Sequence, residues 1–133
     1  MFIYTTELLH FKNIKMQITN TGLTATIGSN AGTGGTVNVK GDNTKGVISV
    51  TTGTNPGGRN ICKVFFTQPY GSENIFVEIL PISVLSWESQ AVAEASESGS
   101  FELNSNVQLD EAAGGLTYQW SYTVTEIIEP NTP

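Results

Sequence analysis

Few residues in this 133-residue chain could act as catalytic groups or metal ligands, and the first candidates are the sole histidine and the sole cysteine. His10 stands beside Leu9 and Phe11, whereas Cys62 lies in the apolar run 61–66. Zinc needs three or four nitrogen or sulfur ligands, and a catalytic triad or a Cys–His pair would depend on His10 alone. We therefore expect no metal site here, and we interpret Cys62 as a small buried hydrophobic residue.

The acidic residues of the second half are the next candidates, because two carboxylates about 5–10 Å apart can hydrolyse glycosidic bonds. They are Glu88, Glu94, Glu97, Glu102, Asp110 and Glu111. Nothing in their spacing brings one pair together, and acids among Ser and Ala usually face water. We expect a non-enzymatic protein without catalytic residues.

Two glycine-rich segments resemble ligand-binding loops without completing them. Segment 28–35 lacks the Gly-Lys-Ser/Thr ending and the following helix that a phosphate-binding loop needs. Segment 41–46 (GDNTKG) begins like a calcium loop but lacks its third acid and its distal glutamate. Both segments are typical of β-turns, and we expect neither a cofactor nor a metal.

The two tryptophans have different surroundings. Trp120 lies in a strongly alternating segment and is expected in the core. Trp87 borders the small, acidic segment 88–100, where an exposed ring could stack on a sugar. Trp87 is therefore the candidate contact for a glycan.

The segments that position these residues read as strands joined by glycine-rich turns. Thr and Val fit a pleated, half-buried surface, and Gly supplies the conformations that turns require. The cleanest alternation places one set of side chains on a single face, namely Tyr118, Trp120, Tyr122 and Val124. The predicted strands are 14–19, 23–27, 36–40, 47–52, 61–67, 75–80, 101–104 and 116–127.

Two further segments are less regular. Residues 82–87 are expected to be extended, and residues 88–100 to form a surface loop or a short helix. Eight or nine strands at this spacing predict an all-β protein with a single antiparallel β-sandwich of jelly-roll type. We place this domain at residues 16–133, after a short N-terminal arm at residues 1–15.

Charge divides the chain sharply. All six basic residues precede residue 64, where only Glu7 and Asp42 oppose them, so residues 1–63 carry +4. Ten acids and no base follow, which gives −10. Solvated surface and complementary contact between subunits both fit this division. Nucleic-acid binding is not expected without an arginine cluster, nor membrane insertion without a run of about 18 apolar residues.

The arm is rich in large apolar side chains that keep no clean period. They are Phe2, Leu8, Leu9, Phe11, Ile14 and Ile18. Packing of the arm on a neighbouring subunit and an additional strand of the same core both remain open. Few charges protect the strands between residues 36 and 67, and open sheet edges need cover. We therefore predict a homotrimer.

Several motifs together resemble a small Gly/Thr/Val-rich β-sandwich domain of tailed-phage virion proteins. The similarity begins with AGTGGTVNVKG (31–41) and GVISVTTGT (46–54). It continues through VFFT (64–67), the segment 76–81 and the segment 100–103, and ends in TYQWSYTV (117–124). The stretch 81–98 departs from that pattern.

The resemblance implies a trimeric, non-enzymatic structural protein on the virion surface, made in the host cytoplasm. A domain that stands almost alone after a short arm favours a capsid decoration (cement) protein on the head, with itself and the major capsid protein as partners. The alternative is a tail-fibre tip that binds a host surface glycan. The candidate interface residues are Phe2, Leu8, Leu9, Phe11, Lys12, Lys15, Lys40, Lys45 and Arg59.

Overall fold

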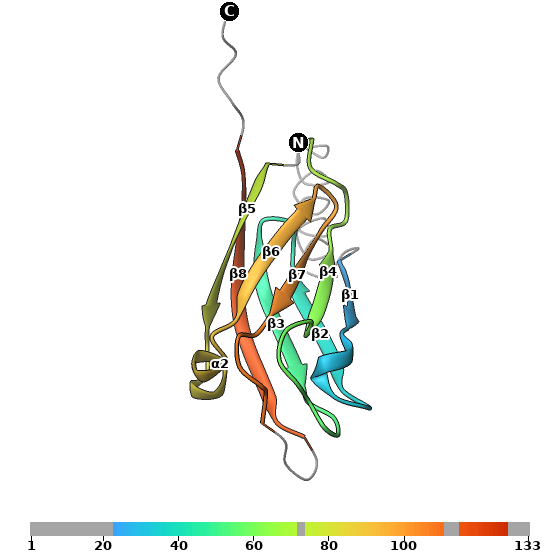
Figure 1. The fold of residues 1–133 in the computed structure, drawn as a ribbon. Coiled ribbons are helices and arrows are strands. Elements are labelled where there is room, and N and C mark those ends of the chain that lie inside the picture. Colours follow the sequence, from blue (N-terminus) through green and yellow to red (C-terminus); the bar gives the residue numbers. More distant parts are fainter. Residues whose placement is uncertain (1–22, 72–73, 111–114, 128–133) are drawn as a thin grey trace, which may run out of the picture.

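The fold is a sandwich of two four-stranded antiparallel sheets, as expected (Figure 1). The computed structural model describes residues 23–71, 74–110 and 115–127. One sheet has the order β1-β4-β7-β6, from Thr24–Ile27, Cys62–Phe65, Ser100–Asn104 and Val92–Glu97. The other has the order β2-β3-β8-β5, from Thr36–Gly41, Lys45–Thr51, Thr117–Glu126 and Ile75–Pro81. A 3-10 turn (η1, Ser29–Ala31) and one short helix (α2, Val84–Ser89) complete the described elements.

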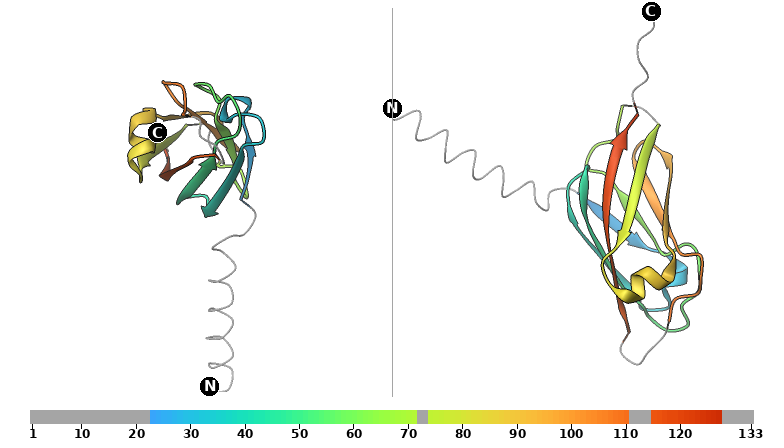
Figure 2. Two further views of the ribbon diagram at one scale, coloured as in Figure 1. Left: turned by 90° about the horizontal axis from the view of Figure 1, so that it is seen from below. Right: turned by 90° about the vertical axis from the view of Figure 1, so that its left-hand side faces the viewer.

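The sandwich is confirmed. Among the described strands, β2–β3 and β6–β7 are hairpins within one sheet, and the other five connections cross from one sheet to the other. At the flanks the two sheets approach each other, because β1 lies beside β2 and β5 lies beside β6 (Figure 2). The expected arm at 1–15 and the expected strand at 14–19 lie outside the described residues.

Side-chain alternation along β8 organises the core. The inward face carries Tyr118, Trp120, Tyr122 and Val124, all buried as predicted. From the opposite sheet Phe101 meets Tyr122 with ring centroids 5.5 Å apart, and Phe66 meets Phe101 at 5.8 Å. Such aromatic contacts add to the stabilisation that burial of their area already provides. The core therefore runs between the sheets as one continuous layer.

Cys62 belongs to this core. Its side chain has no exposed surface, which confirms the prediction of a small buried hydrophobic residue. Burial raises the pKa of the thiol from 9.0 to about 12, because the apolar interior disfavours a thiolate. The thiol is therefore inert in the native protein at neutral pH.

The segment that resembled a calcium loop is the β2–β3 turn. The Asp42 carboxylate accepts hydrogen bonds from the amides of Thr44 (2.8 Å) and Lys45 (3.0 Å). The Tyr122 hydroxyl donates to the Asp42 carbonyl at 2.6 Å from below the turn. Among the described residues no group of His, Cys, Asp and Glu could hold a metal ion. The carboxylate closes the turn, as Asx residues commonly do.

Two predictions between residues 82 and 100 are wrong. Residues 84–87, expected to be extended, belong to the helix α2, because Ser83 caps it by accepting a hydrogen bond from the Ser86 amide (3.3 Å). Residues 92–97, expected in a loop or helix, form the edge strand β6. Ala93 and Ala95 pack on the core there, so small side chains suffice where β6 lies close to β5.

The described helices are short. None is long and apolar enough to cross a membrane.

Candidate functional site

The end of the sandwich that carries α2 holds the most distinctive side chains. Ser86 fixes the helix there, because its hydroxyl accepts a hydrogen bond from the Gln119 amide of β8 (2.7 Å) and contacts the Ser83 hydroxyl (2.8 Å). The Ser89 carbonyl accepts a bond from the Asn106 amide (3.2 Å) on the other side. Gln90 ends the helix in the left-handed conformation, with φ 54°. The helix therefore holds one orientation relative to β8 and to the segment after β7.

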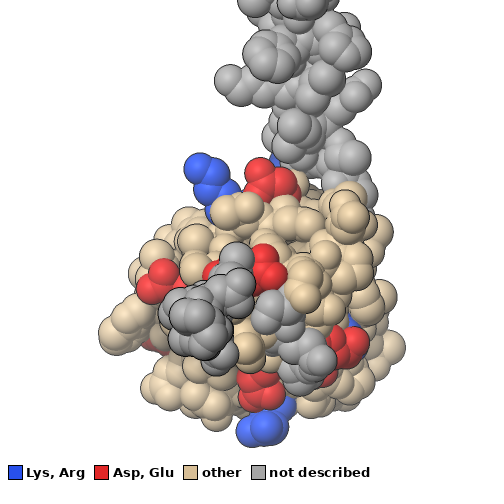
Figure 3. All heavy atoms as spheres, turned by 90° about the horizontal axis from the view of Figure 1, so that it is seen from above, with Lys and Arg blue, Asp and Glu red and all other residues tan. Residues whose placement is uncertain are grey.

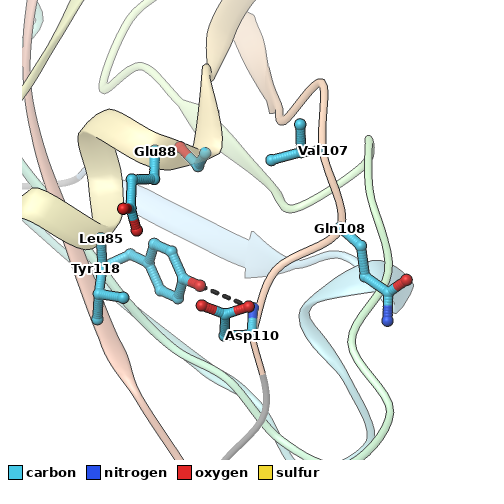
Figure 4. A pocket seen from close by; sticks show the side chains of 7 residues that line it. Leu85, Glu88, Val107, Gln108, Asp110 and Tyr118 are labelled. Carbon is cyan, nitrogen blue, oxygen red and sulfur yellow. Dashed lines mark hydrogen bonds between the residues drawn. The ribbon is translucent and has the colours of Figure 1, made fainter.

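Between α2 and the segment after β7 lies a hollow of about 140 Å³, which we call the α2 pocket (Figure 4). Its lining consists of Leu85, Glu88, Ser89, Val107, Gln108, Asp110 and Tyr118. Figure 4 shows the Glu88 and Asp110 side chains reaching toward Tyr118 from opposite elements. The Tyr118 hydroxyl accepts a hydrogen bond from the Asp110 amide at 2.8 Å.

The electrostatics of the pocket are set by these acids. Burial raises the pKa of Tyr118 above its ordinary 10.0, and the negative charges of Asp110 and Glu88 raise it further, against the lowering effect of the hydrogen bond. The Trp120 ring stacks behind the Tyr118 ring with centroids 5.9 Å apart. The buried Trp120 Nε1 has no hydrogen-bond partner among the described residues. Small-molecule sites usually enclose about 300–1,000 Å³. This pocket is thus large enough only for a few waters or the end of a ligand.

A second feature adjoins the pocket. Five apolar side chains, each more than half exposed, follow β5 and α2, and we call them the β5–α2 stripe. They are Phe76, Leu80, Ile82, Val84 and Trp87. Phe76 and Leu80 lie on the outer face of β5, and Trp87 lies on the face of α2 that does not line the pocket. Large exposed apolar patches mark interaction sites on soluble proteins.

The predicted site residues are only partly brought together. Lys40 and Lys45 flank the β2–β3 turn and are both exposed. Arg59 is exposed in the loop before β4, where its amide donates to the Ser105 carbonyl (2.8 Å). Trp87 is 70% exposed and Trp120 is buried, in line with their sequence surroundings. Phe2, Leu8, Leu9, Phe11, Lys12 and Lys15 lie outside the described residues.

Sequence reasoning missed the stripe and the pocket. A signal for the stripe existed, because Phe76 and Leu80 make both faces of the 75–80 segment apolar. That pattern is typical of a strand with cover on two sides. The pocket left no such signal, since Glu88 and Asp110 belong to different elements.

No family model, no curated protein and no solved structure matches this chain.

Proposed function

We propose that this chain is a structural protein of a tailed-phage virion that acts by binding and transforms no substrate. In this proposal it is a homotrimeric decoration (cement) protein on the head exterior, which stabilises the capsid by bridging its subunits. Residues 1–15 form an arm that contacts a neighbouring copy or the capsid. The basic residues Lys12, Lys15, Lys40, Lys45 and Arg59 belong to the protein–protein interface, where they meet an acidic surface.

The observation that carries the proposal is the β5–α2 stripe, which gathers five of the exposed large apolar side chains along two consecutive elements of the two-sheet framework. Apolar side chains that are more than half exposed, such as Leu80 and Val84, contribute little hydrophobic free energy until another surface buries them. The stripe borders β5, an edge strand of its sheet, and such edges also favour association. The motif resemblance supplies the kind of assembly, because that domain occurs on virion surfaces.

Sparse charge agrees with a protein that binds over a broad surface. Charged residues make up 14% of the chain. Figure 3 views the end at which β8 finishes and shows few charged side chains, separated by wide uncharged areas. A surface of this composition loses little hydration when another protein covers it.

The test is to image the virion that carries the protein and to measure its binding to capsids prepared without it. We expect density at regular positions on the head lattice and saturable binding, and we expect deletion of residues 1–15 to weaken binding at least tenfold. Unchanged affinity after the deletion would remove the role of the arm. Density confined to the tail would overturn the decoration proposal.

The α2 end supports a second candidate, a tail-fibre tip that binds a host surface glycan. Trp87 exposes most of its ring, and the carboxylates of Glu88 and Asp110 lie in the adjoining pocket (Figure 4). Sugar sites commonly combine a flat aromatic face with a few polar groups of this kind.

A glycan array tests the second candidate directly. We expect binding that is lost in Trp87→Ala and retained in Trp87→Phe, which keeps an aromatic face, and in the matched control Val84→Ala. No binding to any glycan by the unaltered protein, or equal binding by all variants, would dismiss it.

A further inference from the structure

Among the residues that the structure describes, the basic residues lie on one flank of the sandwich and the acidic residues lie on the other, except Asp42 in the β2–β3 turn of the basic flank. The sheet orders place β1–β4 on one flank and β5–β8 on the other, so the two halves of the sequence do not interleave. The described basic residues lie on or beside β2, β3 and β4, and are Lys40, Lys45, Arg59 and Lys63. The other flank carries Glu78, Glu88, Glu94, Glu97, Glu102, Asp110 and Glu126.

Most of this charge is available to a partner. Within residues 23–71, 74–110 and 115–127 the one ion pair joins Lys63 Nζ to Glu97 Oε1 at 3.2 Å. Lys40 on β2 and Glu78 on β5 are exposed at opposite edges of the same sheet, and Lys45, also exposed, begins β3 beside β2. Complementary flanks of this kind orient two copies and accelerate their encounter.

The acidic flank also carries the β5–α2 stripe and an open strand edge. The Ile82 amide donates to the Gln119 carbonyl (2.9 Å), and the Ile127 amide donates to the Asn74 carbonyl (2.7 Å). In an antiparallel ladder with this register, the backbone N–H and C=O groups of Val77 and Ile79 point away from β8. No described strand pairs with β5 on that side. Pro81, which lacks an amide hydrogen, suits such an edge.

The remaining residues 1–22 have the composition to cover this flank. They contain Phe2, Leu8, Leu9 and Phe11, and their two lysines against one acid give a net positive charge. They join the described chain at β1, on the basic flank and across the sandwich from β5 (Figures 1 and 2). The β5–α2 stripe of another copy is therefore a more direct partner for them than the stripe of their own.

From this arrangement we propose that copies of the chain associate head to tail. The basic flank of one copy, with its residues 1–22, covers the acidic flank and β5–α2 stripe of the next. A heterologous contact between two different surfaces closes into a ring when its rotation permits. The inference rests on the homotrimer of the proposed function and names the surfaces that form it.

Charge reversal on the full-length protein tests the polarity of the contact. The variant Lys40→Glu/Lys45→Glu takes the net charge of residues 1–63 from +4 to 0, and Glu78→Lys/Glu88→Lys takes that of residues 64–133 from −10 to −6. Each variant therefore places like charges at the positions where the contact requires opposite ones. By sedimentation at micromolar concentration, we expect the unaltered protein at three times the 14.2 kDa of one chain and each variant at the mass of one chain. The quadruple variant restores opposite charges between the two exchanged pairs of positions, and we expect it to regain the trimer.

Removal of apolar side chains tests the stripe separately. We expect Phe76→Ser/Leu80→Ser to lower the association constant at least tenfold, whereas Val107→Ser, an exposed apolar side chain outside the stripe, leaves it unchanged. Far-ultraviolet circular dichroism confirms that each variant is folded. A monomeric unaltered protein, or a trimer that persists in both charge reversals, would overturn the inference.

The two proposals fail separately. If the protein forms a trimer that responds to the charge and stripe variants as expected but does not bind capsids, the head-to-tail contact stands and the decoration function is wrong. If the protein binds capsids but is a monomer both in solution and on the lattice, the capsid-binding role stands and the head-to-tail contact is wrong. Glycan binding that depends on Trp87, with no effect of Phe76→Ser/Leu80→Ser on mass, would assign the stripe to a sugar instead and overturn the inference.

Discussion

Gly46 lies directly opposite Tyr122 in the β3–β8 ladder, and a Cβ atom at Gly46 would come within 2.6 Å of the Tyr122 hydroxyl. The ring passes beneath the glycine so that its hydroxyl can donate to the Asp42 carbonyl at 2.6 Å. Tyr70 reaches the same turn through a hydrogen bond to the Asn43 carbonyl (2.5 Å). The absence of a side chain at Gly46 thus lets Tyr122 reach the turn that carries Lys45, and Tyr70 holds the same turn independently.

We therefore expect Gly46→Ala to destabilise the protein by about 1–3 kcal/mol, because the new methyl group must displace both the Lys40 carbonyl and the buried Tyr122 ring. The measurement is the free energy of unfolding from urea titration. Gly71→Ala is the matched control, since a Cβ there meets only the Glu126 carboxylate at an ordinary 3.6 Å. Equal stability of the two variants would show that Tyr122 does not hold this position.

The second prediction concerns the attachment of α2 to the sheet. Ser86→Ala removes the acceptor of the Gln119 amide, and Ser86 is almost fully buried. An unsatisfied buried amide costs about 1–3 kcal/mol, so we expect the free energy of unfolding to fall by that amount. Ser98→Ala, a partly exposed serine in the β6–β7 turn, is the control and should change it by less than about 0.5 kcal/mol. A loss shared by both variants would contradict the role given to Ser86.

The sandwich could be predicted from the sequence because its central strands alternate cleanly. The segment 116–127 became β8, and its inward aromatic side chains form the core. The edge strand β6 could not be predicted in the same way, since Ala93 and Ala95 carry too little hydrophobic signal. The helix α2 has six residues, and helices this short depend on a cap and on tertiary contacts that no local pattern reveals.

The candidate surfaces depend on strand order, which the sequence does not encode locally. Separation of charge between the two halves was visible along the chain, but its separation in space required β8 to pair with both β3 and β5. The α2 pocket likewise joins Glu88 and Asp110 only because the segment after β7 returns beneath the helix. The exposure of Trp87 agrees with its position beside Ser86 and Glu88, and its contact with a glycan stays a prediction.

Alkaline pH provides a third prediction through Cys62. The thiol ionises above about pH 9 in the unfolded chain, but burial raises its pKa to about 12 in the folded protein. Between these values the folded state binds one more proton than the unfolded state. The free energy of unfolding therefore falls as pH rises, by about 1.4 kcal/mol per pH unit for one proton. The stabilising contribution is complete below pH 9.

Urea titrations at pH 7, 8, 9 and 10 measure this slope. Cys62→Ala is less stable at every pH because it leaves a cavity, but its decline between pH 9 and 10 should be shallower than that of the unaltered protein. The raised pKa values of Tyr70, Tyr118 and Tyr122 act in both proteins and therefore cancel in the comparison. Parallel slopes in the two proteins would contradict burial of the thiol as its cause.

The exposed Trp87 and the buried Trp120 give a fourth prediction, read by fluorescence. Iodide reaches only exposed rings, so Trp87, at 70% exposure, should be quenched and Trp120, at 1%, should not. In the monomeric variant Glu78→Lys/Glu88→Lys we expect a quenchable fraction that disappears when Trp87→Phe is added. In the unaltered trimer the same fraction should be protected, since the neighbouring copy covers the β5–α2 stripe. Full quenching of Trp87 in a trimer of confirmed mass would place the contact on another surface.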